Sequence, residues 1–148
     1  MNNYNKTIGI EVHCELKTKN KIFSPALSNY GSMANTNVNV IDLGYPGTLP
    51  VLNLDVVRLA IKACHVLNLH ITDKMHFDRK NYFYPDNPKN FQITQQRTPI
   101  GTDGYVEIEV DGVKKRDRLF YCSIKLRKAG VCVQMARSTI LPTWLLRG

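Results

Sequence analysis

The sequence predicts an α+β fold, a mostly antiparallel sheet with one helix on its face, and three patterns support this prediction. Residues 7–16 alternate apolar and polar side chains, as a half-buried strand does. Residues 53–68 repeat apolar side chains every three or four positions, as an amphipathic helix does. Asp111 and Gly112 follow another alternating segment, residues 105–110, and this arrangement is typical of a β-hairpin.

Each of these elements has a local signal for where it begins. Asn53 is a favoured N-cap for the helix, and Asp55 lies in its first turn, where the helix dipole favours an acid. The second strand of the hairpin should begin at Val113. Residues 38–43 are expected to form a further short strand.

The composition of the chain predicts one domain. Its 148 residues are 43% hydrophobic and 22% charged, which is enough for a core, and no apolar run approaches the length that a membrane span needs. The first residues lack the pattern of a signal peptide, so we expect a cytoplasmic protein with no membrane. The four cysteines form no CxxC pair, so neither a zinc ribbon nor a redox motif is indicated.

The net charge of +8 comes from the end of the chain. Residues 1–113 hold 11 Lys and Arg and 11 Asp and Glu, whereas residues 114–148 hold nine bases and one acid. A basic RNA-binding module is therefore one alternative function. The scatter of these bases among apolar residues argues against it, because bases that bind phosphates gather on one face.

One face of the first strand carries possible metal ligands. Glu11, His13 and Glu15 alternate along it, so neighbouring side chains could lean onto one cation. Two carboxylates and an imidazole suit Mg²⁺ or Mn²⁺ better than a structural zinc ion. The alternative is a polar face open to water.

Residues 77–95 combine five charges with five aromatic rings and two prolines. The prolines predict a loop of defined shape, which could aim side chains. Its lysines and aspartates could form a buried polar relay with aromatic walls, or the segment could be an ordinary packed loop with ion pairs. The side chains of this relay would be Asp78, Lys80, Asp86 and Lys89, with walls from Tyr82, Phe83, Tyr84 and Phe91.

Three long segments resemble a known family in order and spacing. They read IGIEVHCELKTKNKIFSP, ANTNVNVIDLGYPGTLPVLN and FDRKNYFYPDNPKNFQITQ. Residues 1–116 are similar to the N-terminal part of the B subunit of the aspartyl/glutamyl-tRNA(Asn/Gln) amidotransferase, the GatB family. The resemblance implies part of a cradle domain similar to the glutamine synthetase fold.

The resemblance also implies an activity, which is that of a ligase subunit in protein biosynthesis. Such a subunit converts Glu-tRNA(Gln) to Gln-tRNA(Gln), or Asp-tRNA(Asn) to Asn-tRNA(Asn). ATP phosphorylates the side-chain carboxylate on the tRNA, and ammonia obtained from glutamine then displaces the phosphate. The implied partners are the A and C subunits and misacylated tRNA, and the implied cofactors are ATP and Mg²⁺ or Mn²⁺.

The matching positions imply roles for particular residues. Glu11 and His13 fall on the divalent-ion motif of the family, whereas Lys80, Tyr82 and Lys89 fall on its ammonia path. Some members carry a zinc knuckle made of two cysteine pairs. The corresponding residues here are Ser24, Ala26, Asn39 and Asp42, so we expect no zinc.

The resemblance ends after Arg116, where the family continues with an acidic segment that completes the metal shell. Residues 117–148 contain no Glu and are expected to be a non-homologous, poorly ordered tail, produced by a frameshift or a sequencing error. The chain is also about a third of the usual length of the family. A truncated, inactive fragment of the family protein is therefore the second alternative.

Overall fold

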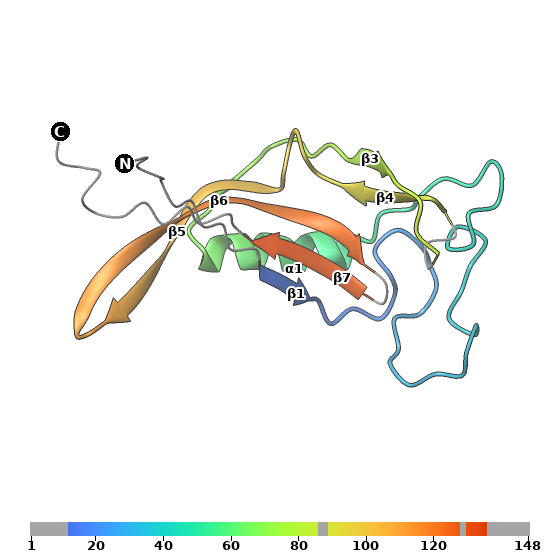
Figure 1. The fold of residues 1–148 in the computed structure, drawn as a ribbon, viewed down its shortest axis with the longest axis horizontal. Helices are drawn as coiled ribbons and strands as arrows, with labels where there is room; N and C mark the ends of the chain where they lie inside the picture. Colours follow the sequence, from blue (N-terminus) through green and yellow to red (C-terminus); the bar gives the residue numbers. More distant parts are fainter. Residues whose placement is uncertain (1–11, 86–88, 128–129, 136–148) are drawn as a thin grey trace, which may run out of the picture.

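The computed structural model describes residues 12–85, 89–127 and 130–135, and it has the expected α+β architecture (Figure 1). A five-stranded antiparallel sheet has the strand order β1-β7-β6-β5-β2, and β3 and β4 form a separate two-stranded sheet. The strands are β1 (Val12–Glu15), β2 (His70–Ile71), β3 (Asp78–Asn81), β4 (Phe91–Thr94), β5 (Gly101–Val110), β6 (Val113–Arg127) and β7 (Gly130–Met135).

Helix α1 (Leu54–Val66) begins where the sequence predicts. The side chain of Asn53 accepts a hydrogen bond from the backbone N–H of Asp55 at 2.9 Å, which makes Asn53 the N-cap. The Asn53 amide also donates to the carbonyl oxygens of Asn20 and Lys21, at 3.2 and 3.3 Å. The same residue therefore caps the helix and ties it to the first loop.

The core lies between α1 and the large sheet, which the helix crosses on one face in Figure 1. Cys64 of α1 and Cys122 of β6 are both fully buried there, so these two cysteines serve as small core side chains. The other buried apolar residues are Ile22, Phe23, Val56, Val57, Ala60, Leu69, Ile93, Ile100, Leu119 and Ile124. Within the described ranges no helix is long and apolar enough to cross a membrane.

The predicted hairpin is confirmed. Asp111 and Gly112 have φ angles of 53° and 75°, as a two-residue turn of this kind requires, and β6 begins at Val113. Strand β6 then passes through the expected boundary at Arg116 and continues to Arg127. The division of the chain into residues 1–116 and 117–148 stays a prediction.

The strand expected at residues 38–43 is wrong, because these residues form a tight turn. Asn39 accepts a hydrogen bond from the backbone N–H of Ile41 at 3.1 Å, and Asp42 accepts one from the backbone N–H of Asn39 at 3.0 Å. Backbone bonds from Leu43 to Asn39 and from Gly44 to Ile41 close the turn. Short polar side chains that bond to nearby backbone groups compete with strand formation, and in this segment their bonds stabilise a turn in place of a strand.

Candidate functional site

The segment from 77 to 95, expected to be a shaped loop, contains a β-hairpin. Strands β3 and β4 pair in an antiparallel register in which Lys80 lies opposite Gln92. The backbone N–H of Tyr82 donates to the carbonyl oxygen of Asn90 at 3.1 Å and extends the pairing beyond the strands. The sequence did not predict these strands, because the charged residues of β3 hide the apolar alternation that usually marks a strand.

Two of the residues expected on the ammonia path lie together on this hairpin. The Lys80 ammonium nitrogen is 5.9 Å from the centre of the Tyr82 ring, which is a cation–π distance. The Tyr82 ring packs edge-on against Tyr84, with 5.6 Å between the ring centres. Lys80 is exposed and Tyr82 is half-buried, so this pair is open to solvent on one side.

In the part of the chain that the structure describes, the aromatic walls expected around the lysines are not closed. Phe83 is 82% exposed and Tyr84 is 63% exposed, so their rings do not shield Lys80 from water. Phe91, in contrast, is half-buried and lies under the guanidinium of Arg79, 4.2 Å from ring centre to Cζ. The hairpin therefore exposes the apolar rings of Phe83 and Tyr84, and exposed apolar surface of this kind favours contact with another molecule.

The acid expected in the relay has other partners. Asp78 accepts hydrogen bonds from the backbone N–H groups of Gln96 and Arg97 at 2.9 and 3.2 Å, and its other oxygen is 3.8 Å from the Arg97 guanidinium. These bonds hold the pKa of the Asp78 carboxyl below its usual value. Asp78 thus fixes the chain after β4, and Asp86, the second acid of the expected relay, lies outside the described residues.

Lys89, the third residue expected on the ammonia path, contacts the turn at residues 39–45. It is half-buried and packs against Gly44. Burial lowers the pKa of the Lys89 ammonium, the negative charge of Asp42 opposes this shift, and the positive charge of Lys21 adds to it. Lys89 is therefore more easily deprotonated than a lysine in water.

The expected metal ligands are only partly described. His13 is an exposed residue of β1, opposite Gln134 of β7, and Glu15 is exposed two positions further on. Glu11 lies outside the described residues. Among the residues that the structure describes, no three His, Cys, Asp or Glu side chains are grouped to hold a metal ion. The metal site stays a prediction.

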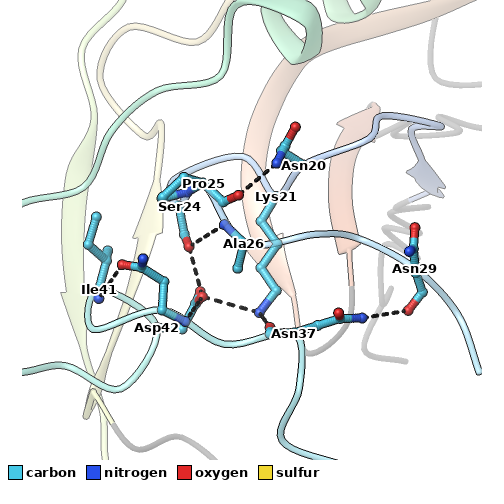
Figure 2. A network of polar contacts seen from close by, with 10 residues as sticks. Asn20, Lys21, Ser24, Pro25, Ala26, Asn29, Asn37, Ile41 and Asp42 are labelled. Carbon is cyan, nitrogen blue, oxygen red and sulfur yellow. Dashed lines mark hydrogen bonds and ion pairs between the residues drawn. The ribbon is translucent and has the colours of Figure 1, made fainter. Parts of the chain in front are cut away.

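The four residues that correspond to the zinc knuckle are linked by hydrogen bonds, and Ser24 and the backbone of Asn39 both donate to the carboxylate of Asp42. Figure 2 shows Ser24, Ala26 and Asp42 of this network. Asp42 Oδ2 accepts a hydrogen bond from Ser24 Oγ at 2.8 Å and lies 3.3 Å from the Lys21 ammonium nitrogen. Ser24 Oγ in turn accepts from the backbone N–H of Ala26 at 3.1 Å. A cation is present in this network, but it is the ammonium of Lys21.

The Lys21–Asp42 pair was not predicted from the sequence. Its side chains are only 25% and 14% exposed, and Lys21 also donates to the carbonyl oxygen of Asn37 at 2.6 Å. The run of Ser, Asn and Asp residues in this region could have indicated side-chain-to-backbone bonding. Nothing local in the sequence indicates which lysine would join them.

Comparison with known proteins defines the class to which this fold and these side chains belong. The family described as the GatB/GatE catalytic domain matches residues 6–129, and the chain belongs to this family. The match includes the first strand, the polar network, the helix and the β3–β4 hairpin.

Individual relatives give the same family at high identity. The chain is 63% identical to the B subunit of the aspartyl/glutamyl-tRNA(Asn/Gln) amidotransferase of Limosilactobacillus fermentum, 60% to that of Oceanobacillus iheyensis and 59% to that of Pediococcus pentosaceus. Each similarity extends over 114 residues, which are 77% of this chain and 24% of the relative. The matched part of the chain thus spans about a quarter of the length of these curated relatives.

Proposed function

We propose that this chain is the N-terminal part of the catalytic cradle in the B subunit of a tRNA-dependent amidotransferase. The observation that carries the proposal is the family match over residues 6–129, together with 57–63% identity to amidotransferase B subunits. The proposed reaction converts Glu-tRNA(Gln) to Gln-tRNA(Gln), Asp-tRNA(Asn) to Asn-tRNA(Asn), or both. The side-chain carboxylate is first phosphorylated by ATP, and ammonia then displaces the phosphate.

The residues of the β3–β4 hairpin would handle the ammonia. Two amines lie along this part of the chain. Lys80 lies over the Tyr82 ring, and Lys89 is half-buried against Gly44. An amine beside an aromatic ring can exchange a hydrogen bond with a small polar molecule, while the ring limits access of water. The exposed rings of Phe83 and Tyr84 would be covered by a neighbouring protein chain, since such apolar surface favours contact with another protein.

The proposed cofactors are ATP and Mg²⁺ or Mn²⁺, with Glu11 and His13 as the metal ligands on this chain. His13 fits this role because it is exposed on the sheet edge formed by β1. The described residues do not supply three ligands in one place, so the remaining ligands would come from elsewhere. When bound, the ion would neutralise phosphate charge.

The proposed partners are the A and C subunits and misacylated tRNA, and the proposed location is the cytoplasm. The relatives are each one lettered subunit of an amidotransferase, which supports an assembly of several chains. Their names also specify an aspartyl/glutamyl-tRNA, which supports tRNA as the substrate carrier.

A chimeric protein tests the proposal. Residues 6–116 of this chain would replace the matching segment in the Limosilactobacillus fermentum relative, which would then be purified with its A and C subunits. The chimera should form amidated tRNA when supplied with glutamine, ATP and misacylated tRNA. Lys80→Met should lower this rate, whereas Lys74→Met, at an exposed lysine before the hairpin, should leave it unchanged. An inactive chimera that assembles normally and binds tRNA would contradict the proposal.

A further inference from the structure

Gly44 allows the turn at residues 39–45 to approach Lys89 closely. Gly44 has a left-handed φ of +71°, and a Cβ added to it would lie 3.1 Å from Lys89 Cγ and 3.4 Å from Lys89 Cα. Few Cβ atoms in proteins tolerate such a contact, so any larger residue would push Lys89 away. Gly47, three residues later, has a similar φ of +80° but has no atom within 4 Å of its added Cβ.

The position of Gly44 is fixed by bonds within the turn. Asn39 and Asp42 each accept a hydrogen bond from a backbone N–H of the turn, and the Gly44 N–H donates to the carbonyl oxygen of Ile41 at 3.2 Å. The Tyr45 N–H donates to the carbonyl oxygen of Val40 at the same distance. A turn that satisfies its own polar groups can act as a rigid support for a neighbouring side chain.

Asp42 connects this support to the start of the domain. Its carboxylate is held by Ser24 and Lys21 (Figure 2). The neighbouring Ile22 and Phe23 belong to the core. The charges of Asp42 and Lys21 both affect the protonation of Lys89. Asp42 favours its protonated form, and Lys21 disfavours it. Segments that are about 20, 40 and 90 residues into the chain therefore meet at one half-buried cluster of charges.

We propose that Gly44 and Asp42 are positioning residues for Lys89. Gly44 sets how closely the lysine stem packs against the turn, and Asp42, two residues earlier in the same turn, supplies a negative charge near the amine. The proposal rests on the proposed function only in assigning Lys89 to the ammonia path. The contact between Lys89 and the turn is a property of this chain alone.

Titration of Lys89 in the purified 148-residue chain tests the proposal. The carbon and proton resonances of its ε-methylene group would be followed by NMR against pH and assigned with a Lys89→Arg chain. Gly44→Ala should shift the Lys89 pKa upward, because displaced lysine regains water. Gly47→Ala imposes the same backbone strain without the contact, so it should leave the titration unchanged. Identical Lys89 titrations in the two variants would overturn the role of Gly44.

Asp42→Asn provides the second arm of the test. It keeps the size of the side chain and removes the charge that favours protonated Lys89, so the Lys89 pKa should shift downward. An unchanged titration would overturn the role of Asp42. If Gly44→Ala prevents folding, Gly44→Asn and Gly47→Asn replace the alanine pair, because asparagine adopts positive φ more readily. Since this measurement needs no partner, tRNA or ATP, its failure is distinguishable from failure of the proposed function.

Discussion

Gly104 of β5 lies against the carbonyl oxygen of Leu67, at the end of α1. A Cβ added to Gly104 would be 2.5 Å from that oxygen. The neighbouring Tyr105 N–H donates to the same oxygen at 3.1 Å, so a backbone hydrogen bond joins the end of the helix to the strand. Only glycine permits this approach, and the helix therefore docks on the sheet through backbone as well as side-chain contacts.

Gly104→Ala should lower the free energy of unfolding by about 1–3 kcal/mol, the usual cost of overpacking a dense region. The nearest atom in the way is a hydrogen-bonded backbone oxygen, which cannot rotate aside, and two atoms of the Leu69 side chain also lie 2.7 Å from the added Cβ. Urea denaturation monitored by circular dichroism would measure the change.

Gly101→Ala is the matched comparison for Gly104→Ala. Its added Cβ would meet the Cys64 sulfur at 2.9 Å, and a thiol can move more easily than a backbone oxygen. The Gly101 variant should therefore be destabilised less. Equal stability of the Gly104 variant and the wild type would show that α1 does not pack on β5 as described.

Asn53 performs two tasks, and two substitutions separate them. Asn53→Ala removes the N-cap and the bonds to Asn20 and Lys21, so it should lower the free energy of unfolding by about 1–2 kcal/mol. Asn53→Asp keeps an acceptor for the Asp55 N–H but cannot donate to the two carbonyl oxygens. The aspartate variant should lie between the wild type and the alanine variant in urea unfolding. An aspartate variant as stable as the wild type would show that the bonds to the first loop contribute nothing.

Asp78 should make the stability of the chain depend on acid. Its folded-state pKa is below the usual value of 3.8, because backbone N–H groups stabilise the carboxylate. A group with a lowered folded pKa stabilises the fold above its unfolded pKa, and this contribution is lost as the pH falls through the folded pKa.

The comparison with Asp78→Asn isolates this contribution from those of the other acids. At neutral pH the wild type should have the larger free energy of unfolding, and the difference should narrow as the pH falls from about 5 to below 3.8. Chemical denaturation at each pH would measure both chains. A difference that stays constant over this range would contradict the hydrogen bonds to Asp78.

The features that the sequence predicted are those with local causes. Asn53 caps a helix two residues later, and Asp111 and Gly112 turn a hairpin between adjacent strands, so each signal and its effect lie close together in the chain. The expected strand at residues 38–43 failed for a related reason. Its apolar residues suggested a strand, but Asn39 and Asp42 bond to the backbone of the same segment.

The polar cluster around Asp42 could not be predicted, because its members are far apart in the sequence. Asp42 pairs with Lys21 and its charge acts on Lys89, yet in the sequence each lysine has other charged residues nearby that were equally plausible partners. Tertiary packing alone selects them. The resemblance to the family named Lys89 without indicating that Gly44 would pack against it or that the charge of Asp42 would act on it.

The network around Asp42 predicts that the chain gains no stability from zinc. Ser24, Asn39 and Asp42 offer only oxygen and backbone groups, Ala26 offers no side-chain ligand, and the Lys21 ammonium already lies 3.3 Å from the carboxylate. Structural zinc sites prefer thiolate and imidazole, and an ammonium repels a second cation. The midpoint of thermal unfolding should therefore be the same with zinc and with a chelator.

A chain in which all four residues are replaced by cysteine is the positive control for the zinc prediction. Because the four positions meet in space, this chain should bind one zinc ion, and its unfolding temperature should rise with zinc and fall with chelator. Metal content after dialysis would confirm the stoichiometry. Stoichiometric zinc bound at these four positions in the wild-type chain would contradict the prediction, since the Lys21–Asp42 pair would have to open to release its carboxylate to the metal.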